Sequence, residues 1–151
     1  MKKIFLLLSS LLVVGVITST AQRDPSVDPK VKESFKKEFP EAQLLKWSGT
    51  PDYNRADFVM KDYRLEAFFS KQGELIETRR DLIYHQLPLT VMKELEKNFP
   101  ETTFSQIEEI SNSSGTKYSL IAEGSKRIFK IVATPDGTTS VVERTRKSKI
   151  G

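Results

Sequence analysis

The stretch "FKKEFPEA" at residues 35–42 returns 60 positions later as "LEKNFPET" at residues 95–102. The apolar residues of the two copies match as follows: Val31, Phe35 and Phe39 correspond to Val91, Leu95 and Phe99. Apolar side chains at positions i, i+4 and i+8 lie along one stripe of a helix, so each copy predicts an amphipathic helix. Proline is excluded from a helix interior, so each helix should end just before its Phe-Pro pair.

The starts of the two helices are also similar. Asp28 and Pro29 offer an N-cap and a first-turn proline, and Leu87-Pro88 places a proline at the second start. Chance similarity between two amphipathic helices is the alternative explanation. It is disfavoured because the match continues beyond the helices.

Strand-like segments follow each helix. "AQLLKW" (42–47) and "TFSQIEEI" (103–110) both lead into turn-prone sequence, and "ADFVM" (56–60) then aligns with "KYSLI" (117–121), with Phe58 matching Tyr118. Residues 64–78 align with residues 128–142 at an offset of 64, which we attribute to four extra residues in a hairpin near "EGSK" (123–126). Gly73 and Gly137 correspond, each at a predicted positive-φ turn.

Each copy therefore reads as a helix followed by about four strands. One copy alone would bury too little apolar surface, whereas two copies can share one antiparallel sheet with both helices packed on one face, an α+β fold. We expect a single domain at residues 22–151. Its two repeats cover about residues 28–82 and 87–146, joined by "DLIYHQLP" (81–88).

Alternation along the strands assigns side chains to the two sheet faces. The residues expected to face the helices are Phe58, Met60, Leu65, Ala67, Phe69, Tyr118, Leu120, Phe129 and Ile131. Those expected on the opposite face are Asp57, Val59, Arg64, Glu66, Phe68, Lys117, Ser119, Ile121, Ile128, Lys130 and Val132.

The N-terminus has the pattern of a secretory signal peptide at residues 1–21. Lys2 and Lys3 precede the apolar run at residues 4–17, and "STA" (19–21) predicts cleavage before Gln22. The apolar run is too short to span a bilayer comfortably, which disfavours a membrane anchor. The chain has no cysteine, which excludes disulfides and a lipidated cysteine. We expect a periplasmic or extracellular protein with no stable membrane span after cleavage.

The mature chain would carry 22 basic and 20 acidic side chains, a net charge of +2. That balance gives weak support for a nucleic-acid or membrane-surface partner, and we expect no nucleic-acid binding. The tail from Arg144 to Lys149 is basic and could attract anionic polymers or lipid head groups, although such an end is more often a solvated terminus.

The sequence lacks the residues that most kinds of catalytic site require. His85 is the single histidine and there is no cysteine, which disfavours a zinc site and any nucleophile with a histidine base. No phosphate-binding or dinucleotide glycine pattern occurs. We therefore expect no metal, no cofactor and no enzymatic activity. A carboxylate-dependent hydrolase stays open as an alternative, because Glu66, Glu74 and Glu77 could meet on one sheet face.

Three segments resemble a known family: "VKESFKKEFPEAQLLKW" (31–47), "RLEAFFSKQG" (64–73) and "LPLTVMKELEKNFPET" (87–102). They are similar to secreted bacterial PepSY-like proteins with two αβββ repeats, related in fold to the β-lactamase-inhibitor-protein (BLIP) type. The resemblance implies a protein- or peptidase-binding module. Ser70 and Lys71 stand where an acidic turn is expected, and Ile107 replaces a tryptophan, so an acidic site in those turns is not implied here.

The face away from the helices is the candidate binding surface, because it mixes apolar with basic residues. Its predicted anchor is Phe68. The other candidate partner-binding residues are Arg64, Lys130, Val59, Ile128 and Trp47. Two plainer explanations compete: strands favour β-branched and aromatic residues even when exposed, and Trp47 at a strand end suits a half-buried cap of the core.

The sequence thus favours an exported, non-enzymatic binding module that acts on an envelope or secreted protein. The resemblance implies an inhibitor-like role for it. A self-associating structural envelope protein is the alternative, and we expect a monomer or a weak homo-oligomer.

Overall fold

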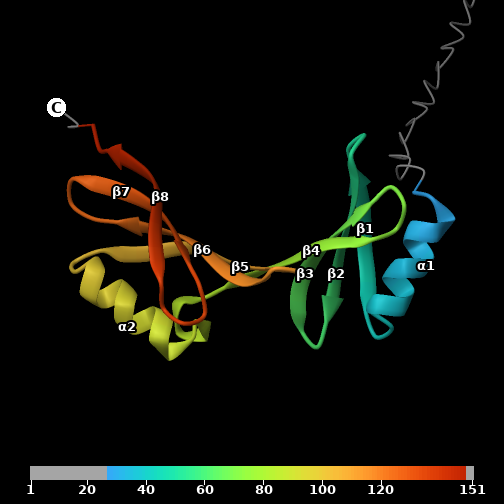
Figure 1. The fold of residues 1–151 in the computed structure, drawn as a ribbon, viewed down its shortest axis with the longest axis horizontal. Helices are drawn as coiled ribbons and strands as arrows, with labels where there is room; N and C mark the ends of the chain where they lie inside the picture. Colours follow the sequence, from blue (N-terminus) through green and yellow to red (C-terminus); the bar gives the residue numbers. More distant parts are fainter. Residues whose placement is uncertain (1–26, 149–151) are drawn as a thin grey trace, which may run out of the picture.

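The computed structural model of the protein describes residues 27–148, so the predicted signal peptide lies outside the described residues. The fold is α+β, with two α-helices and one eight-stranded antiparallel sheet in which strand order follows chain order from β1 to β8 (Figure 1). The first half contains α1 (Pro29–Glu38), β1 (Gln43–Gly49), β2 (Tyr53–Met60), β3 (Tyr63–Ser70) and β4 (Leu75–Leu82). A 3₁₀ turn, η1 (Tyr84–Gln86), precedes the second half, which contains α2 (Leu89–Asn98), β5 (Thr103–Asn112), β6 (Gly115–Glu123), β7 (Arg127–Ala133) and β8 (Thr139–Arg146).

Both helices end where the sequence predicts. Phe39 and Phe99 are the C-caps, and each donates its backbone N–H to the carbonyl four residues earlier, at 2.9 Å. At the start of α1, the Asp28 carboxylate accepts a hydrogen bond from the backbone N–H of Lys30 at 2.8 Å. Helix α2 has Pro88 at the same place, with no side-chain cap.

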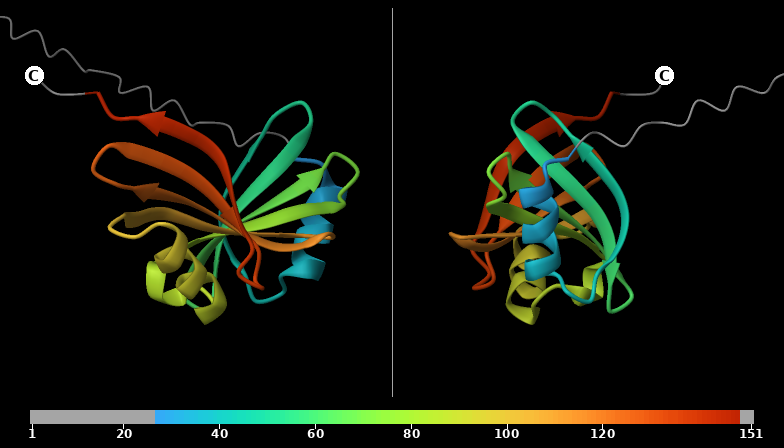
Figure 2. Two further views of the ribbon diagram at one scale, coloured as in Figure 1. Left: turned by 60° about the vertical axis from the view of Figure 1, so that its left-hand side comes forward. Right: turned by 90° about the vertical axis from the view of Figure 1, so that its right-hand side faces the viewer.

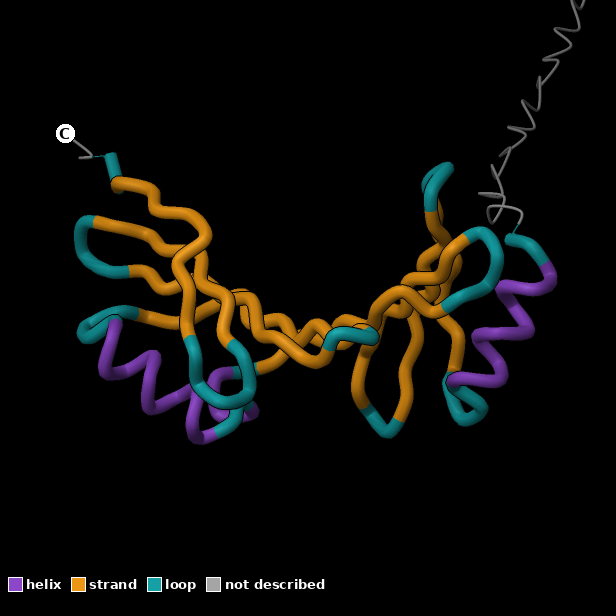
Figure 3. Tube along the Cα trace, viewed as in Figure 1, coloured by secondary structure: helices purple, strands orange, loops and turns teal. Residues whose placement is uncertain are grey.

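The two helices cover the same face of the sheet but build two separate cores near its ends (Figure 3). Under α1 the buried residues are Val27, Val31, Phe35, Trp47, Ala56, Phe58, Ala67 and Phe69. Under α2 they are Leu82, Leu87, Val91, Leu95, Ile107, Tyr118, Leu120, Ala122, Ile131 and Ala133. The predicted helix-facing residues all belong to these cores or pack against them, so that part of the face assignment is confirmed.

Each half holds one helix and four strands, one strand more than an αβββ unit. The halves differ in one hairpin. In the first half Gly49 pairs with Asn54 and Ala56 with Ala67, and in the second half Glu109 pairs with Tyr118 and Leu120 with Ile131. Residue numbers in β5 are therefore 60 higher than those of the equivalent residues in β1. Residue numbers in β6 and β7 are 64 higher than those of the equivalent residues in β2 and β3.

The four extra residues thus lie in the β5–β6 hairpin, and our prediction that they lie near residues 123–126 is wrong. The β6–β7 turn is as tight as its counterpart, because Gly124 donates its N–H to the Arg127 carbonyl at 2.9 Å. The alternating apolar residues of β6 align equally well when the alignment is shifted by four positions. The sequence therefore did not show whether the extra residues lie in the β5–β6 or the β6–β7 hairpin. The faces are unaffected because an even shift keeps every side chain on its side of the sheet.

The halves meet through the β4–β5 ladder, which pairs Glu77 with Asn112 at one end and Leu82 with Ile107 at the other. Between the two cores this junction is polar. On the helix side, the Arg80 guanidinium lies 3.0 Å from Glu109 and 5.0 Å from the centre of the Tyr63 ring. The middle of the sheet is thus held by backbone hydrogen bonds and ion pairs rather than by a shared apolar core.

Candidate functional site: the open sheet face

The face of the sheet opposite the helices, here called the open face, is left uncovered by either helix (Figure 2). Cross-strand pairing places the alternating charged residues of β2 and β3 on it. Arg55 lies 3.2 Å from both Asp57 and Glu66. Asp57 is only 5% exposed. Its Oδ2 accepts a hydrogen bond from Arg55 Nη2 at 3.4 Å, while its Oδ1 has no aligned donor among the described residues, so Arg55 compensates the buried charge.

Arg79 on β4 is the centre of a second charged group. Its guanidinium lies 2.5 Å from Glu77 and 3.9 Å from Glu108 on the neighbouring strand β5. The same guanidinium lies over the Phe68 ring, 4.7 Å from its centre. Arg79 therefore ties together three strands and is held on two sides, by carboxylates and by an aromatic ring.

The surroundings of Arg79 and Glu108 raise the pKa of both side chains. Burial lowers the pKa of Arg79, but the hydrogen bond and charge of Glu77, with Glu108 and Glu66, raise the pKa overall. Burial raises the pKa of Glu108; Arg79 opposes this rise, while Glu66, Asp81 and Glu77 add to it. Glu108 therefore takes up a proton more readily than an ordinary glutamate.

This shift makes a prediction about pH. Because the folded state raises the pKa of Glu108, it binds a proton more readily than the unfolded chain does, and Glu108 contributes stability as pH falls through its folded pKa. Glu108→Gln should remove that gain, so the variant should lose stability relative to the unmodified chain as pH falls through this range. Melting curves across mildly acidic pH test this, with Glu143→Gln on β8 as the control. Equal pH profiles for the two variants would contradict it.

Three adjoining hollows form a trough across the open face, with volumes of about 360, 60 and 450 Å³. The first and second share Glu66 and Arg79, and the second and third share Asp81 and Glu108. The charged side chains lining the trough are Arg55, Arg64, Arg79, Lys130, Glu66, Glu77, Asp81, Glu108 and Glu143. Both signs of charge alternate along it, so it is not a basic track.

Phe68, the predicted anchor, lies on the open face but is only 9% exposed. The Tyr53 ring covers one part of it, with ring centres 5.5 Å apart, and Arg79 covers another. Our expectation that Phe68 is an exposed apolar residue is therefore wrong. In this arrangement Phe68 packs against the Tyr53 ring and the Arg79 guanidinium.

The other predicted binding residues are spread over the molecule. Arg64 is exposed and lines the central hollow, and Lys130 is exposed and lines the largest one. Val59 and Ile128 are half-buried, on strands β2 and β7, and line none of the three hollows. Trp47 is 5% exposed and belongs to the core under α1, on the opposite side of the sheet. The structure therefore brings Arg64, Lys130, Phe68, Val59 and Ile128 to one face and places Trp47 on the other.

Sequence reasoning missed the charged residues at the centre of the trough, Arg55, Arg79, Asp81 and Glu108. A signal was present: "RAD" (55–57), "RLE" (64–66) and "ETRRD" (77–81) carry opposite charges two positions apart. On a strand, such residues share a face. The pattern alone could not predict which of these charged residues meet, because that depends on the pairing of β4 with β3 and β5.

Within residues 27–148, no helix is long and apolar enough to cross a bilayer. In the same range no three histidine or acidic side chains gather in an arrangement that could hold a metal ion.

No family model and no curated protein sequence matches the chain. Solved structures do. A DUF2874 family protein from Bacteroides ovatus superposes with a TM-score of 0.69 at 18% identity, over 81% of this chain and 89% of that one. A BLIP-like protein from Bacteroides fragilis gives 0.67 at 17%, over 79% and 85%. A candidate periplasmic protein from Bacteroides eggerthii gives 0.67 at 19%, over 81% and 90%. At these identities the likeness establishes a shared BLIP-like fold.

Proposed function

We propose that this chain is an exported, non-enzymatic binding protein that engages a partner protein of the cell envelope through the trough of the open face. The observation that carries the proposal is the run of three adjoining hollows lined by side chains of both charge signs. Alternating charges suit a protein partner with complementary side chains, whereas a nucleic acid would require a predominantly basic surface. The signal-peptide pattern and the candidate periplasmic neighbour support export.

Arg79 is the residue best suited to dominate such an interface. Arginine is enriched among residues that carry most of the binding energy, and such residues lie near the interface centre. Arg79 is on the central strand β4, and Glu77, Glu108 and Phe68 hold its guanidinium in place. A side chain already ordered before binding loses less conformational entropy when the partner arrives.

The carboxylates of the trough favour recognition over catalysis. Glu66 lies against Arg55, and Glu77 and Glu108 lie against Arg79. These carboxylates are therefore already engaged by guanidinium groups of the same face, an arrangement suited to recognising complementary charges on a partner. The BLIP-like fold supports the same proposal by analogy.

The test is capture of a partner from the native envelope by the mature chain, followed by affinity measurement on the identified partner. Arg79→Ala should weaken binding by about 30-fold, the loss typical of a central arginine. Arg64→Glu, an exposed change, should weaken it without affecting the fold. Arg127→Ala, on the helix-facing side of β7, is the matched control and should bind normally. Unchanged affinity in both trough variants, with intact melting curves, would refute the proposal.

Self-association is the second candidate, and the edges of the sheet favour it. The outer strands carry exposed apolar residues, Leu44 and Leu45 on β1 and Val141 and Val142 on β8. An edge strand with exposed apolar residues can pair with another chain. The molecular mass of the purified mature chain in solution separates the candidates, since edge pairing predicts a mass that grows with concentration.

A further inference from the structure

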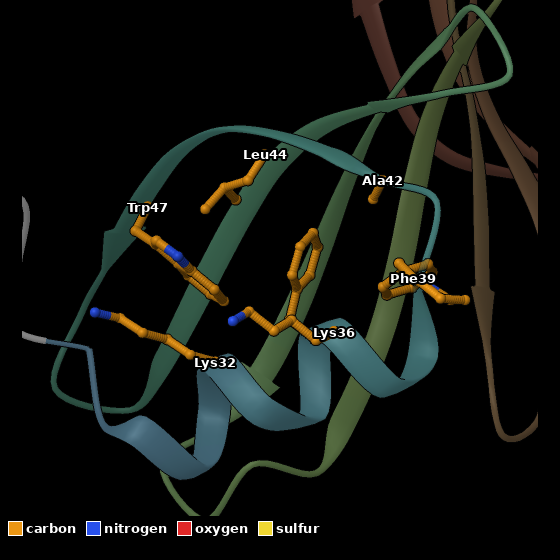
Figure 4. A pocket seen from close by; sticks show the side chains of 8 residues that line it. Lys32, Lys36, Phe39, Ala42, Leu44 and Trp47 are labelled. Atoms are coloured by element: carbon orange, nitrogen blue, oxygen red, sulfur yellow. The ribbon is translucent and has the colours of Figure 1, made fainter.

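An apolar groove of about 430 Å³ lies between α1 and the edge strand β1, away from the open face (Figure 4). Its residues are Lys32, Phe35, Lys36, Phe39, Pro40, Ala42, Leu44 and Trp47. The volume falls in the range of small-molecule sites, and the lining is largely aromatic and aliphatic. The Lys32 and Lys36 side chains extend from α1 on the side of Trp47 (Figure 4). Neither forms an ion pair with another described residue.

The internal repeat shows what the same place holds in the second half. Helices α1 and α2, and strands β1 and β5, correspond at an offset of 60 residues. Buried Val27 corresponds to buried Leu87, and buried Trp47 to buried Ile107. The groove residues Lys32, Lys36 and Leu44 therefore correspond to Met92, Glu96 and Phe104.

Tyr84, from the 3₁₀ turn before α2, contacts those three counterparts. Its ring stacks on Phe104 with centres 5.1 Å apart and planes 5° from parallel. Its hydroxyl lies 3.1 Å from the Glu96 carboxylate and 3.3 Å from the Met92 carbonyl. Burial, followed by the hydrogen bond and charge of Glu96, raises the pKa of Tyr84 to about 12, so the hydroxyl keeps its proton and donates.

In the second half, then, an aromatic ring with a polar end fills the place that is a groove in the first half. The polar partner differs between the halves in a specific way. Glu96 accepts a hydrogen bond from the phenol, whereas its counterpart Lys36 can only donate. Lys32 adds a second positive charge where the second half has Met92. A group that fits the first groove therefore needs an acceptor, and an anionic one is favoured over a neutral one.

We propose that the α1–β1 groove is a binding site for a small aromatic or apolar ligand that carries an anionic group. Its apolar body occupies the position equivalent to the Tyr84 ring, against Phe35, Phe39 and Trp47. Its anionic group is bound by Lys32 and Lys36. This site lies on the other side of the sheet from the trough and does not depend on the function proposed for the trough.

The chain carries its own reporter for this site, because Trp47 is the single tryptophan. The probe is 1-anilinonaphthalene-8-sulfonate, compared with N-phenyl-1-naphthylamine, which has the same aromatic body without the sulfonate. The intact mature chain should bind the sulfonate at one saturable site, with energy transfer from Trp47 to the probe. The uncharged analogue should bind about tenfold more weakly, as expected for the loss of one charge-assisted contact.

Two variants locate the site. Lys32→Met with Lys36→Glu installs the residues of the second half and should weaken sulfonate binding by about tenfold or more, with little effect on the uncharged analogue. Ala42→Phe should fill the groove and weaken binding of both probes. Lys37→Glu reverses one charge on the same helix outside the groove and should leave binding unchanged. Melting curves confirm that each variant is folded.

The outcomes that overturn the proposal are distinct. Equal affinity for the two probes would show an apolar surface without anion selectivity. Weakening of sulfonate binding by Lys37→Glu as large as that by the double variant would show general electrostatic attraction to the helix. Absence of saturable binding or of energy transfer from Trp47 would contradict a small-molecule site and would favour a protein segment as the occupant of the groove.

Discussion

Phe35→Ala should destabilise the protein by about 3–5 kcal/mol, the typical cost of removing a buried phenylalanine. Phe35 is 4% exposed and is the hub of the core under α1. Its ring centre lies 5.2 Å from that of Phe58, 5.5 Å from that of Trp47 and 5.6 Å from that of Phe39. Alanine would leave these rings facing a cavity, and edge-to-face contacts would be lost with the buried area. Denaturant unfolding measures the free energy.

Leu89→Ala is the control for this experiment, because Leu89 is apolar and helical but 64% exposed. It should change the free energy of unfolding by less than about 0.5 kcal/mol. Leu95→Ala, at the position equivalent to Phe35 under α2, should cost about 2–5 kcal/mol. An unchanged free energy of unfolding for Phe35→Ala would mean that the core under α1 is not organised around this ring.

Gly137→Ala should cost roughly 1–3 kcal/mol through its backbone and its surroundings. Gly137 has φ +94°, where side chains are strained, and it packs against the start of α2. A Cβ atom there would lie 3.1 Å from the Thr90 carbonyl oxygen and 3.2 Å from Glu94 Cγ. Gly73 has φ +91° and lies against Lys30 and Ser34 of α1, so Gly73→Ala should behave alike.

Gly115→Ala separates the two contributions to that cost. Gly115 has φ +122°, but a Cβ atom there would meet nothing within 4 Å. It should therefore show the backbone strain without the close contact, and its melting temperature should fall less than that of Gly137→Ala. Equal losses in the two variants would mean that the β7–β8 turn moves freely away from α2.

The fold was predictable because its signals are local. The Phe-Pro pairs end both helices, and the turn glycines Gly73 and Gly137 both have positive φ, as the repeat alignment indicates. Alternation gave the correct faces for Phe58 and Ile131, because successive side chains of a strand point to opposite faces whichever strand it pairs with. The hairpin that contains the extra residues was not predictable, because apolar alternation in β6 matches itself after a shift by four.

The site was predictable only in part, because its formation depends on which strands are neighbours. Phe68 is on the predicted face, yet Arg79 from β4 and Tyr53 from β2 cover it. Nothing within β3 indicates that cover. Likewise, the groove beside Trp47 is recognisable only by comparison with Tyr84, whose contacts with α2 and β5 join segments separated by a turn and a helix.

The agreement between strand order and chain order has a consequence for how the chain folds. Each ladder joins consecutive strands, and every connection except β4–β5, which contains α2, is a hairpin, so the entropic cost of loop closure is small. Proteins whose contacts are local in sequence fold faster than those with distant pairings. The core under α1 is built entirely from the first half, whereas the core under α2 also includes Leu82 of β4. The first half can therefore nucleate by itself, and the β4–β5 ladder then completes the second core. We therefore expect rapid folding for a β-rich chain, starting in the N-terminal half as soon as residues through β4 are free to pair.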